Sequence, residues 1–180
     1  MKKQKKQFLI LLIILIVMIA AYLGAVAYAD TVEKQEAEKE LADKIYITEL
    51  DTAEIQSVTY DYNGETYSFA KEEDVWVSAE DSSLAIIQSK IEKMAEAAAQ
   101  LEAQNMIEEV TDLEQYGLAE PSKTIQFTAG DAKYELWLGD YNTNAAAYYI
   151  CNAADTGVVY TVKSTDITCF NNALESLIEE

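Results

Sequence analysis

The chain contains no histidine and no arginine among its 180 residues, and it has only one proline and six glycines. Histidine is the usual general base near neutral pH and the commonest metal ligand, and arginine forms the bidentate clamp on phosphate groups. No serine stands in a nucleophile elbow, no glycine-rich phosphate loop follows a predicted strand, and no Cys-x-x-Cys pair occurs. The sequence therefore indicates no catalytic residue, no cofactor and no metal site.

Thiols are equally scarce, because Cys151 and Cys169 are the only two cysteines. In an oxidising compartment they could form a disulfide, which would stabilise the fold by about 3 kcal/mol through loop-closure entropy. The alternative is that both are small buried side chains without a covalent partner. The spacing alone leaves both interpretations open.

Positive charge is confined largely to one end of the chain. The 13 lysines stand against 32 acidic residues, which gives a formal net charge of −19. Four lysines precede residue 8 and every acidic residue follows residue 29, so the remainder carries a formal charge of −23. Such a surface repels nucleic acid, whose binding needs clustered cations. It is typical of a solvated extracellular domain, or of one that meets a cationic partner.

One long apolar run, residues 8–29, follows the basic tail of residues 1–7. As a helix it would reach roughly 33 Å, enough to cross a hydrocarbon core of about 30 Å. The lysines before it predict a single-pass membrane helix with a cytoplasmic N terminus and an extracytoplasmic C-terminal part. A cleaved signal peptide is the alternative, since Ala27-Tyr28-Ala29 is a fair cleavage site. The run exceeds the usual signal core of about 7–15 residues.

Beyond the apolar run, residues 30–44 are strong helix formers without glycine or proline, which predicts a helical stalk. Residues 45–180 are then expected to form one extracytoplasmic domain. Alternation of apolar and polar side chains predicts strands in it. Asn63 and Gly64 tolerate the positive φ of a two-residue turn and predict a hairpin. The expected strands are residues 45–47, 55–62, 65–70, 75–77, 106–110, 124–128, 134–138, 147–151 and 158–162.

Two segments carry apolar residues at steps of three and four, which predicts amphipathic helices over residues 82–104 and 166–178. Asp81 or Ser82 is expected to cap the first of them. The predicted fold class is therefore α+β, with antiparallel hairpins packed against two helices. Each half reads as a hairpin, a strand and a helix, which suggests a pseudo-repeat.

Residues 113–121 predict a structural corner made by Tyr116, Gly117, Leu118 and Pro121. A single helical turn is expected to end at Gly117 in the left-handed conformation, and Pro121 blocks a restart. This corner belongs to the run DLEQYGLAEPSKTIQF, which is followed by YELWLGDYN, AYYI and VVYTV.

These four runs resemble the bacterial domain-of-unknown-function family 4340, over roughly residues 45–180. The resemblance implies a membrane-tethered surface domain. In some members it implies association with ABC transporter systems of the gliding-motility type. Because the activity of the family is undefined, the resemblance assigns no catalytic residue.

Three other patterns allow a functional and a plain interpretation. Residues 140–144 begin like a calcium loop, but Ala145 stands where glycine is needed and Cys151 where the bidentate glutamate belongs, so a polar turn is favoured. The carboxylates of residues 72–74 and 108–109 could act as acid and base, or simply be solvated. Trp137, Tyr141 and Tyr148 could form an aromatic contact patch, or cover the second face of a sheet.

The sequence thus predicts a domain anchored in the cell membrane that binds or scaffolds, with a role as accessory subunit of an ABC-type transport assembly. Its expected partners are the membrane and the membrane subunits of that transporter, and not nucleic acid. A surface hydrolase that uses carboxylates, and a purely structural stalked domain, are the alternatives.

Overall fold

The computed structural model describes residues 18, 22 and 44–179. The chain divides into two compact units, Met1–Lys44 and Ile45–Glu180. The predicted basic tail, membrane segment and stalk (residues 1–7, 8–29 and 30–44) lie outside the described residues, apart from residues 18, 22 and 44. Within the described residues, no helix combines the length and the apolar character needed to cross a membrane.

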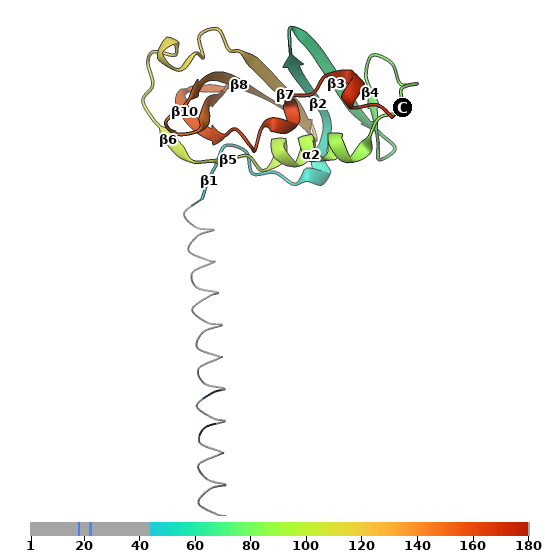
Figure 1. Ribbon diagram of the computed structural model, residues 1–180, viewed down its shortest axis with the longest axis horizontal. Helices are drawn as coiled ribbons and strands as arrows, with labels where there is room; N and C mark the ends of the chain where they lie inside the picture. Colours follow the sequence, from blue (N-terminus) through green and yellow to red (C-terminus); the bar gives the residue numbers. More distant parts are fainter. Residues whose placement is uncertain (1–17, 19–21, 23–43, 180) are drawn as a thin grey trace, which may run out of the picture. The chain divides into compact units, whose positions relative to one another are not determined.

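The unit Ile45–Glu180 is built on an eight-stranded antiparallel sheet with the strand order β4-β3-β2-β7-β8-β9-β10-β6 (Figure 1). Two meanders, β2 to β4 and β7 to β10, meet through the antiparallel pairing of their first strands. A second, two-stranded sheet pairs β1 (Ile45–Tyr46) with β5 (Glu102–Ala103). The strands of the large sheet are β2 (Ile55–Tyr62), β3 (Glu65–Glu72), β4 (Val75–Ser78), β6 (Asn105–Ile107), β7 (Lys123–Ala129), β8 (Ala132–Asn142), β9 (Ala147–Asn152) and β10 (Asp155–Lys163).

The hairpin predicted at Asn63-Gly64 is confirmed. Tyr62 pairs with Glu65, and the two residues between them have φ values of 54° and 82°. Both values lie in the region that a type I′ turn requires, and this turn matches the twist of the flanking strands. The predicted alternation is also confirmed, since Val58 and Tyr60 are fully buried while Thr59 between them is partly exposed.

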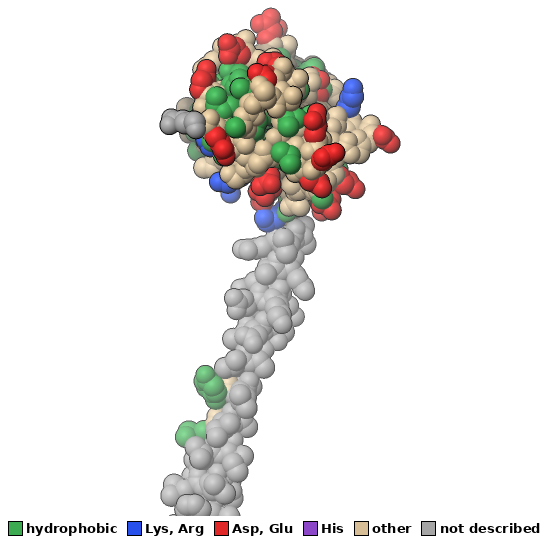
Figure 2. Space-filling view, turned by 90° about the vertical axis from the view of Figure 1, so that its right-hand side faces the viewer, with side chains coloured by type: hydrophobic (Ala, Val, Ile, Leu, Met, Phe, Trp, Pro, Cys, Tyr) green, Lys and Arg blue, Asp and Glu red, His purple; other side chains and the backbone are tan. Residues whose placement is uncertain are grey.

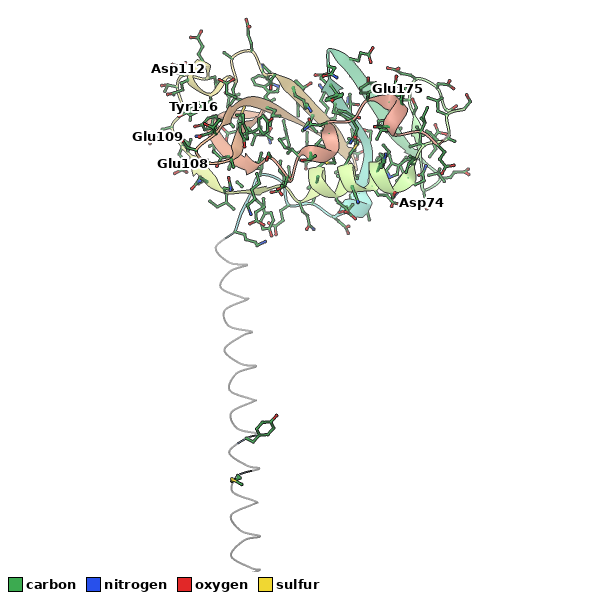
Figure 3. All side chains as sticks on the ribbon, viewed as in Figure 1. Asp74, Glu108, Glu109, Asp112, Tyr116 and Glu175 are labelled. Carbon is green, nitrogen blue, oxygen red and sulfur yellow. The ribbon has the colours of Figure 1, made fainter. Side chains whose placement is uncertain are left out.

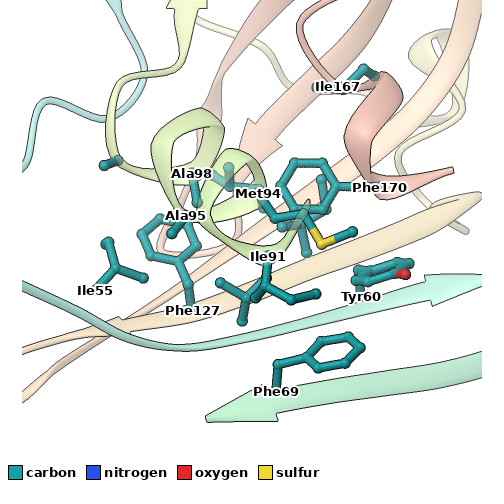
Figure 4. Close-up of a cluster of buried hydrophobic side chains, with 14 of the residues drawn as sticks. Ile55, Tyr60, Phe69, Ile91, Met94, Ala95, Ala98, Phe127, Ile167 and Phe170 are labelled. Carbon is teal, nitrogen blue, oxygen red and sulfur yellow. The ribbon is translucent and has the colours of Figure 1, made fainter. Parts of the chain in front are cut away.

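The core lies on one face of the sheet, under α2 (Gln88–Ala99) and the C-terminal segment. Ile91, Met94, Ala95 and Ala98 of α2 pack there against side chains of the sheet, and Phe170 enters from the C-terminal segment (Figure 4). The small alanines let the helix approach the strands closely, while the aromatic rings of the sheet fill the remaining space. The sheet residues at the centre of this cluster are Val58, Tyr60, Phe69, Ile125, Phe127 and Leu136.

The predicted α+β class with two packed helices is wrong, because residues 44–179 contain one α-helix and far more strand than helix. The second predicted helix, residues 166–178, is instead a pair of 3-10 helices, η3 (Thr168–Phe170) and η4 (Leu174–Ser176). Asn171, Asn172 and Ala173 separate them, and Asn171 leaves the helical region with a φ of −103° and a ψ of 45°. The Asn172 carbonyl accepts from Tyr60 at 2.7 Å, and the Asn171 side chain accepts from Lys123. These tertiary hydrogen bonds hold the linking residues against the sheet in a conformation that is not α-helical.

The first predicted helix is shorter than residues 82–104. Before it, Ile86 bridges to Ile178 and the Ile87 amide donates to Leu177 at 2.8 Å, so this stretch is extended. Asp81 therefore caps no helix, and its carboxylate accepts from Ser83 instead.

At the other end of α2, the Thr48 hydroxyl donates to the Ala98 carbonyl at 2.7 Å and accepts from the Leu101 amide at 3.1 Å. The Leu50 amide donates to the Ala99 carbonyl. These contacts provide hydrogen-bond partners for carbonyl groups of the last turn that have none within the helix, and the helix ends there.

The two halves of the domain resemble each other only in the order of their strands, so the suggested pseudo-repeat is incomplete. The strands of each meander follow one another outward from the central β2 and β7 pair. The second meander has one strand more than the first, and 3-10 helices follow it where α2 follows the first.

Candidate functional site

The corner predicted at residues 113–121 has the expected backbone. The 3-10 helix η2 (Glu114–Tyr116) ends at Gly117, whose φ of 68° and ψ of 22° are left-handed. The Gly117 amide donates to the Glu114 carbonyl, and the Leu118 amide donates to the Leu113 carbonyl, both at 3.0 Å. Leu118 is fully buried. The corner therefore inserts one apolar side chain into the fold.

The corner is seated on Gly139 of β8. A Cβ atom on Gly139 would lie 2.2 Å from the Tyr116 carbonyl oxygen, and one on Gly117 would lie 2.5 Å from the Asp140 Cγ atom. The Tyr116 ring meets the Tyr149 ring edge-on, with centroids 5.0 Å apart. The Tyr-Gly-Leu and Leu-Gly-Asp sequences therefore interlock, and their glycines permit the close approach of the two backbones.

Substitution of Gly117 by valine is expected to lower the free energy of unfolding by about 1 kcal/mol or more, because a β-branched residue is strained at positive φ. The crowding against Asp140 adds to this cost. Chemical unfolding of the full-length chain, followed by tryptophan fluorescence, measures the change. A stability equal to that of the wild type would contradict the role of Gly117 in the corner.

The structure does not bring the predicted aromatic patch together. Tyr141 and Tyr148 pair on the core side of the sheet, with ring centroids 4.8 Å apart. Trp137 lies on the opposite face, where it pairs with Cys151 and packs in a second cluster around Leu118. A register shift between Leu138 and Tyr141 is the cause. One extra residue in a strand moves all later side chains to the other face, and a bulge is not visible in an alternating sequence.

Both cysteines are free, and they lie on opposite sides of the sheet. Cys151 is buried in the second cluster with Leu118 and Val159, whereas Cys169 packs against the main core. The disulfide that the sequence left open is therefore not formed in this structure. Burial raises the pKa of each thiol to about 11.

A thiol of such a raised pKa is almost entirely protonated at pH 8, and the thiolate is the reactive form. We therefore expect the folded, non-reduced chain to react slowly with iodoacetamide at pH 8. The chain unfolded in guanidinium should take up two equivalents. Mass spectrometry of the alkylated protein measures both. Failure to label the unfolded, non-reduced chain would show a disulfide and contradict the free thiols.

The calcium-like residues 140–144 span the end of β8 and the start of the turn to β9. The Asn142 side-chain oxygen accepts from the Asn144 amide at 3.0 Å and from the Ala145 amide at 3.2 Å. The nitrogen of the same amide donates to the Tyr149 hydroxyl at 2.8 Å. Asn142 therefore stabilises a turn, as the plain interpretation predicts. Over residues 44–179, no group of three or more side chains is placed to hold a metal ion.

The paired carboxylates do not converge on a cleft. Glu108 and Glu109 lie at one end of the domain and Asp74 at the other, all with exposed side chains (Figure 3). Acidic side chains are distributed over the visible face of the domain rather than gathered at one place (Figure 2). A hydrolytic pair needs two carboxyl groups within about 10 Å of each other across a substrate. Because the two groups of carboxylates lie at opposite ends of the domain, they cannot act together across one substrate.

The face of β3, β2, β7 and β8 that points away from the core carries an accessible row of polar side chains. We call this surface the open face and define it by Ser57, Thr59, Ser68, Gln126, Thr128, Lys133 and Glu135. Their side chains alternate with buried core residues and are exposed or half-buried. A shallow hollow of about 370 Å³ lies over β2, β7 and β8 on this face.

Hydrogen bonds between neighbouring strands fix the side chains of the open face. The hydroxyls of Ser57 and Thr128 are 2.7 Å apart, and Gln126 donates to Glu135 at 3.1 Å. Glu135 also accepts from the Trp137 indole nitrogen at 2.6 Å. Trp137 thus stands at the border between the open face and the second cluster, and not in an exposed aromatic patch. The alternation in the sequence predicts that the open-face side chains point away from the core. It cannot show which of the side chains on that face are covered by other parts of the chain.

Comparison with known proteins identifies a family but no individual relative. No curated protein and no solved structure matches the chain. The family described as "Domain of unknown function (DUF4340)" matches residues 76–180, more than half of the chain. The match includes the interlocked corner and begins at β4, whereas the resemblance drawn from the sequence began near residue 45. The chain therefore belongs to the DUF4340 family.

Proposed function

We propose that this chain is an extracytoplasmic binding domain, held at the cell membrane by residues 8–29, which acts by contact as an accessory subunit of an ABC-type transport assembly. The association of some family members with such transporters supports the assembly. The lysines before the apolar run and the −23 charge after it support the location.

The observation that carries the contact role is the open face. Side chains of four adjacent strands point outward from a rigid sheet, and cross-strand hydrogen bonds hold them in place. Gln126, at the centre of this face, is exposed. A preorganised polar surface loses little side-chain entropy when a partner covers it.

The expected partner is a basic extracytoplasmic segment of a membrane subunit of the transporter. The domain carries a strong negative charge, and complementary charge accelerates association and suppresses wrong partners. Within the hollow itself, the acidic Glu135 is balanced by Lys133, so the attraction for a basic segment comes from the negative charge of the domain as a whole. Of the two alternatives drawn from the sequence, the hydrolase gains no support from the divergent carboxylates, and the purely structural domain is an outcome of the test below.

Affinity capture from gently solubilised membranes tests this proposal. The Gln126→Arg variant adds a cation to the centre of the open face and should lose the transporter subunits that the wild type captures. Gln100→Arg is the matched control, because Gln100 is equally exposed but lies at the end of α2 on the other side of the sheet. Capture of no membrane subunit by the wild type, or equal capture by Gln126→Arg, would contradict the proposal and favour the purely structural domain.

A further inference from the structure

Lys123 is the one charged residue of the described core that is at least nine-tenths buried. It begins β7 and points to the core side with Ile125 and Phe127. Its ammonium donates to the Phe170 carbonyl at 2.8 Å and to the Asn171 side-chain oxygen, and it lies 5.4 Å from the centre of the Tyr62 ring. Every one of these partners is neutral.

Over residues 44–179, no carboxylate lies within ion-pair distance of Lys123, but the negative charge of Asp61 is close enough to act on it. Burial lowers the pKa of Lys123, and the charge of Asp61 partly opposes this effect. A neutral donor could bond to the same two acceptors, so anchoring the C-terminal segment does not by itself require a charged side chain. A buried charge is costly unless an opposite charge compensates it. An ammonium also has three donors, and the described partners use two. The third donor is therefore available to an acceptor on a ligand.

A pocket of about 410 Å³ adjoins this ammonium at the end of the sheet where β2 ends and β7 begins. Tyr62 and Asn171, the residues on either side of the ammonium, both line it, as do Ser122 and the hairpin residues Asn63 and Gly64. Its volume falls in the range of small-molecule sites.

The pocket also contains a fixed negative charge at Asp61. The Asp61 carboxylate accepts from Thr66 at 2.6 Å and from the side chain and amide of Thr124. Burial alone would raise the pKa of this carboxyl, but the hydrogen bonds from Thr124 and Thr66 and the charge of Lys123 lower it. Asp61 is therefore ionised at neutral pH, and it would repel a ligand with more than one negative charge.

We propose that this pocket binds a small zwitterion, an amino-acid-like molecule whose carboxylate accepts from the Lys123 ammonium and whose cationic group faces Asp61. A zwitterion matches the opposite charges of Lys123 and Asp61 in this pocket, and the ligand as a whole brings no net charge into a strongly acidic domain. This site lies apart from the centre of the open face and does not depend on the proposed partner.

Nuclear magnetic resonance titration of the full-length chain in detergent micelles tests the site, with glycine, acetate and succinate as probes. Glycine should shift the amide signals of Asn63, Gly64, Ser122 and Asn171 in a saturable manner. Acetate, which lacks the cationic group, should bind at least about tenfold more weakly, as expected for the loss of one charge-assisted contact. Succinate, a dianion, should not bind. Absent glycine shifts, or tighter binding of succinate than of glycine, would overturn the proposal.

Two variants assign the roles of the charges. Lys123→Met should weaken glycine binding at least about tenfold, as expected for the loss of a charge-assisted hydrogen bond. Lys163→Met, which removes an exposed lysine of β10 outside the open face, should leave glycine binding unchanged. Unchanged binding in folded Lys123→Met would overturn the proposal. Asp61→Asn decides the matter if Lys123→Met does not fold. It should abolish the preference for glycine over acetate, and an unchanged preference would contradict the site.

Discussion

The Gly139→Ala variant is expected to lose about 3 kcal/mol of unfolding free energy, at the upper end of the range for overpacked sites. The added Cβ atom would lie 2.2 Å from the Tyr116 carbonyl oxygen and 3.0 Å from the Leu118 Cγ atom. The first of these is a backbone atom, so no side-chain rotation can relieve the contact. The corner must lift from β8, which exposes Leu118 and Cys151 of the second cluster.

Gly157→Ala is the matched control for this variant. A Cβ atom on Gly157 meets its nearest neighbour at 3.4 Å, an ordinary contact distance, and this glycine does not have a positive φ. Its stability should stay within about 0.5 kcal/mol of the wild type, as is usual for surface substitutions. Chemical unfolding of the full-length chain compares the two. Equal stabilities for Gly139→Ala and Gly157→Ala would contradict the interlocked corner.

Phe170→Ala is expected to cost about 3–5 kcal/mol, the range for removal of a large buried aromatic side chain. Phe170 is 1% exposed, and its ring meets the Tyr60 ring edge-on with centroids 5.8 Å apart. The variant loses this contact and leaves a cavity between α2 and the sheet (Figure 4).

The outcome of Phe170→Ala tests whether the C-terminal segment belongs to the core despite having no α-helix. Leu174→Ala, at a half-buried position of η4, should cost clearly less. The same unfolding assay measures both. Substitutions outside a core usually cost less than about 1 kcal/mol of unfolding free energy. A loss that small for Phe170→Ala would show that the C-terminal segment is not packed as described.

Local chemistry explains why the strands and turns could be predicted. Alternation along β2, β7 and β8 matches the buried and open sides, and the Asn63-Gly64 and Gly117 turns have the backbone that their residue types favour. These features depend on neighbours in the sequence. The free thiols, in contrast, follow from the side of the sheet on which each cysteine lies, which spacing does not determine.

The sequence-based predictions were wrong where contacts between residues far apart in the sequence determine the conformation. Residues 166–178 have helical spacing but form two 3-10 helices, and Tyr60 and Lys123 of the sheet bond to the residues between them. The bulge in β8 separates Trp137 from Tyr141, although their spacing in a regular strand would place both on one face. The pocket around Lys123 joins residues from β2, β7 and the C-terminal segment, and no local motif connects them.

The most direct test of the contact role is photo-crosslinking in intact cells. A photoreactive amino acid placed at position 126 lies on the open face, and one at position 100 lies on the other side of the sheet. We predict that the full-length chain labelled at position 126 crosslinks to a membrane subunit of the transporter, and that the chain labelled at position 100 does not. Equal crosslinking from both positions, or none from position 126, would contradict binding through the open face.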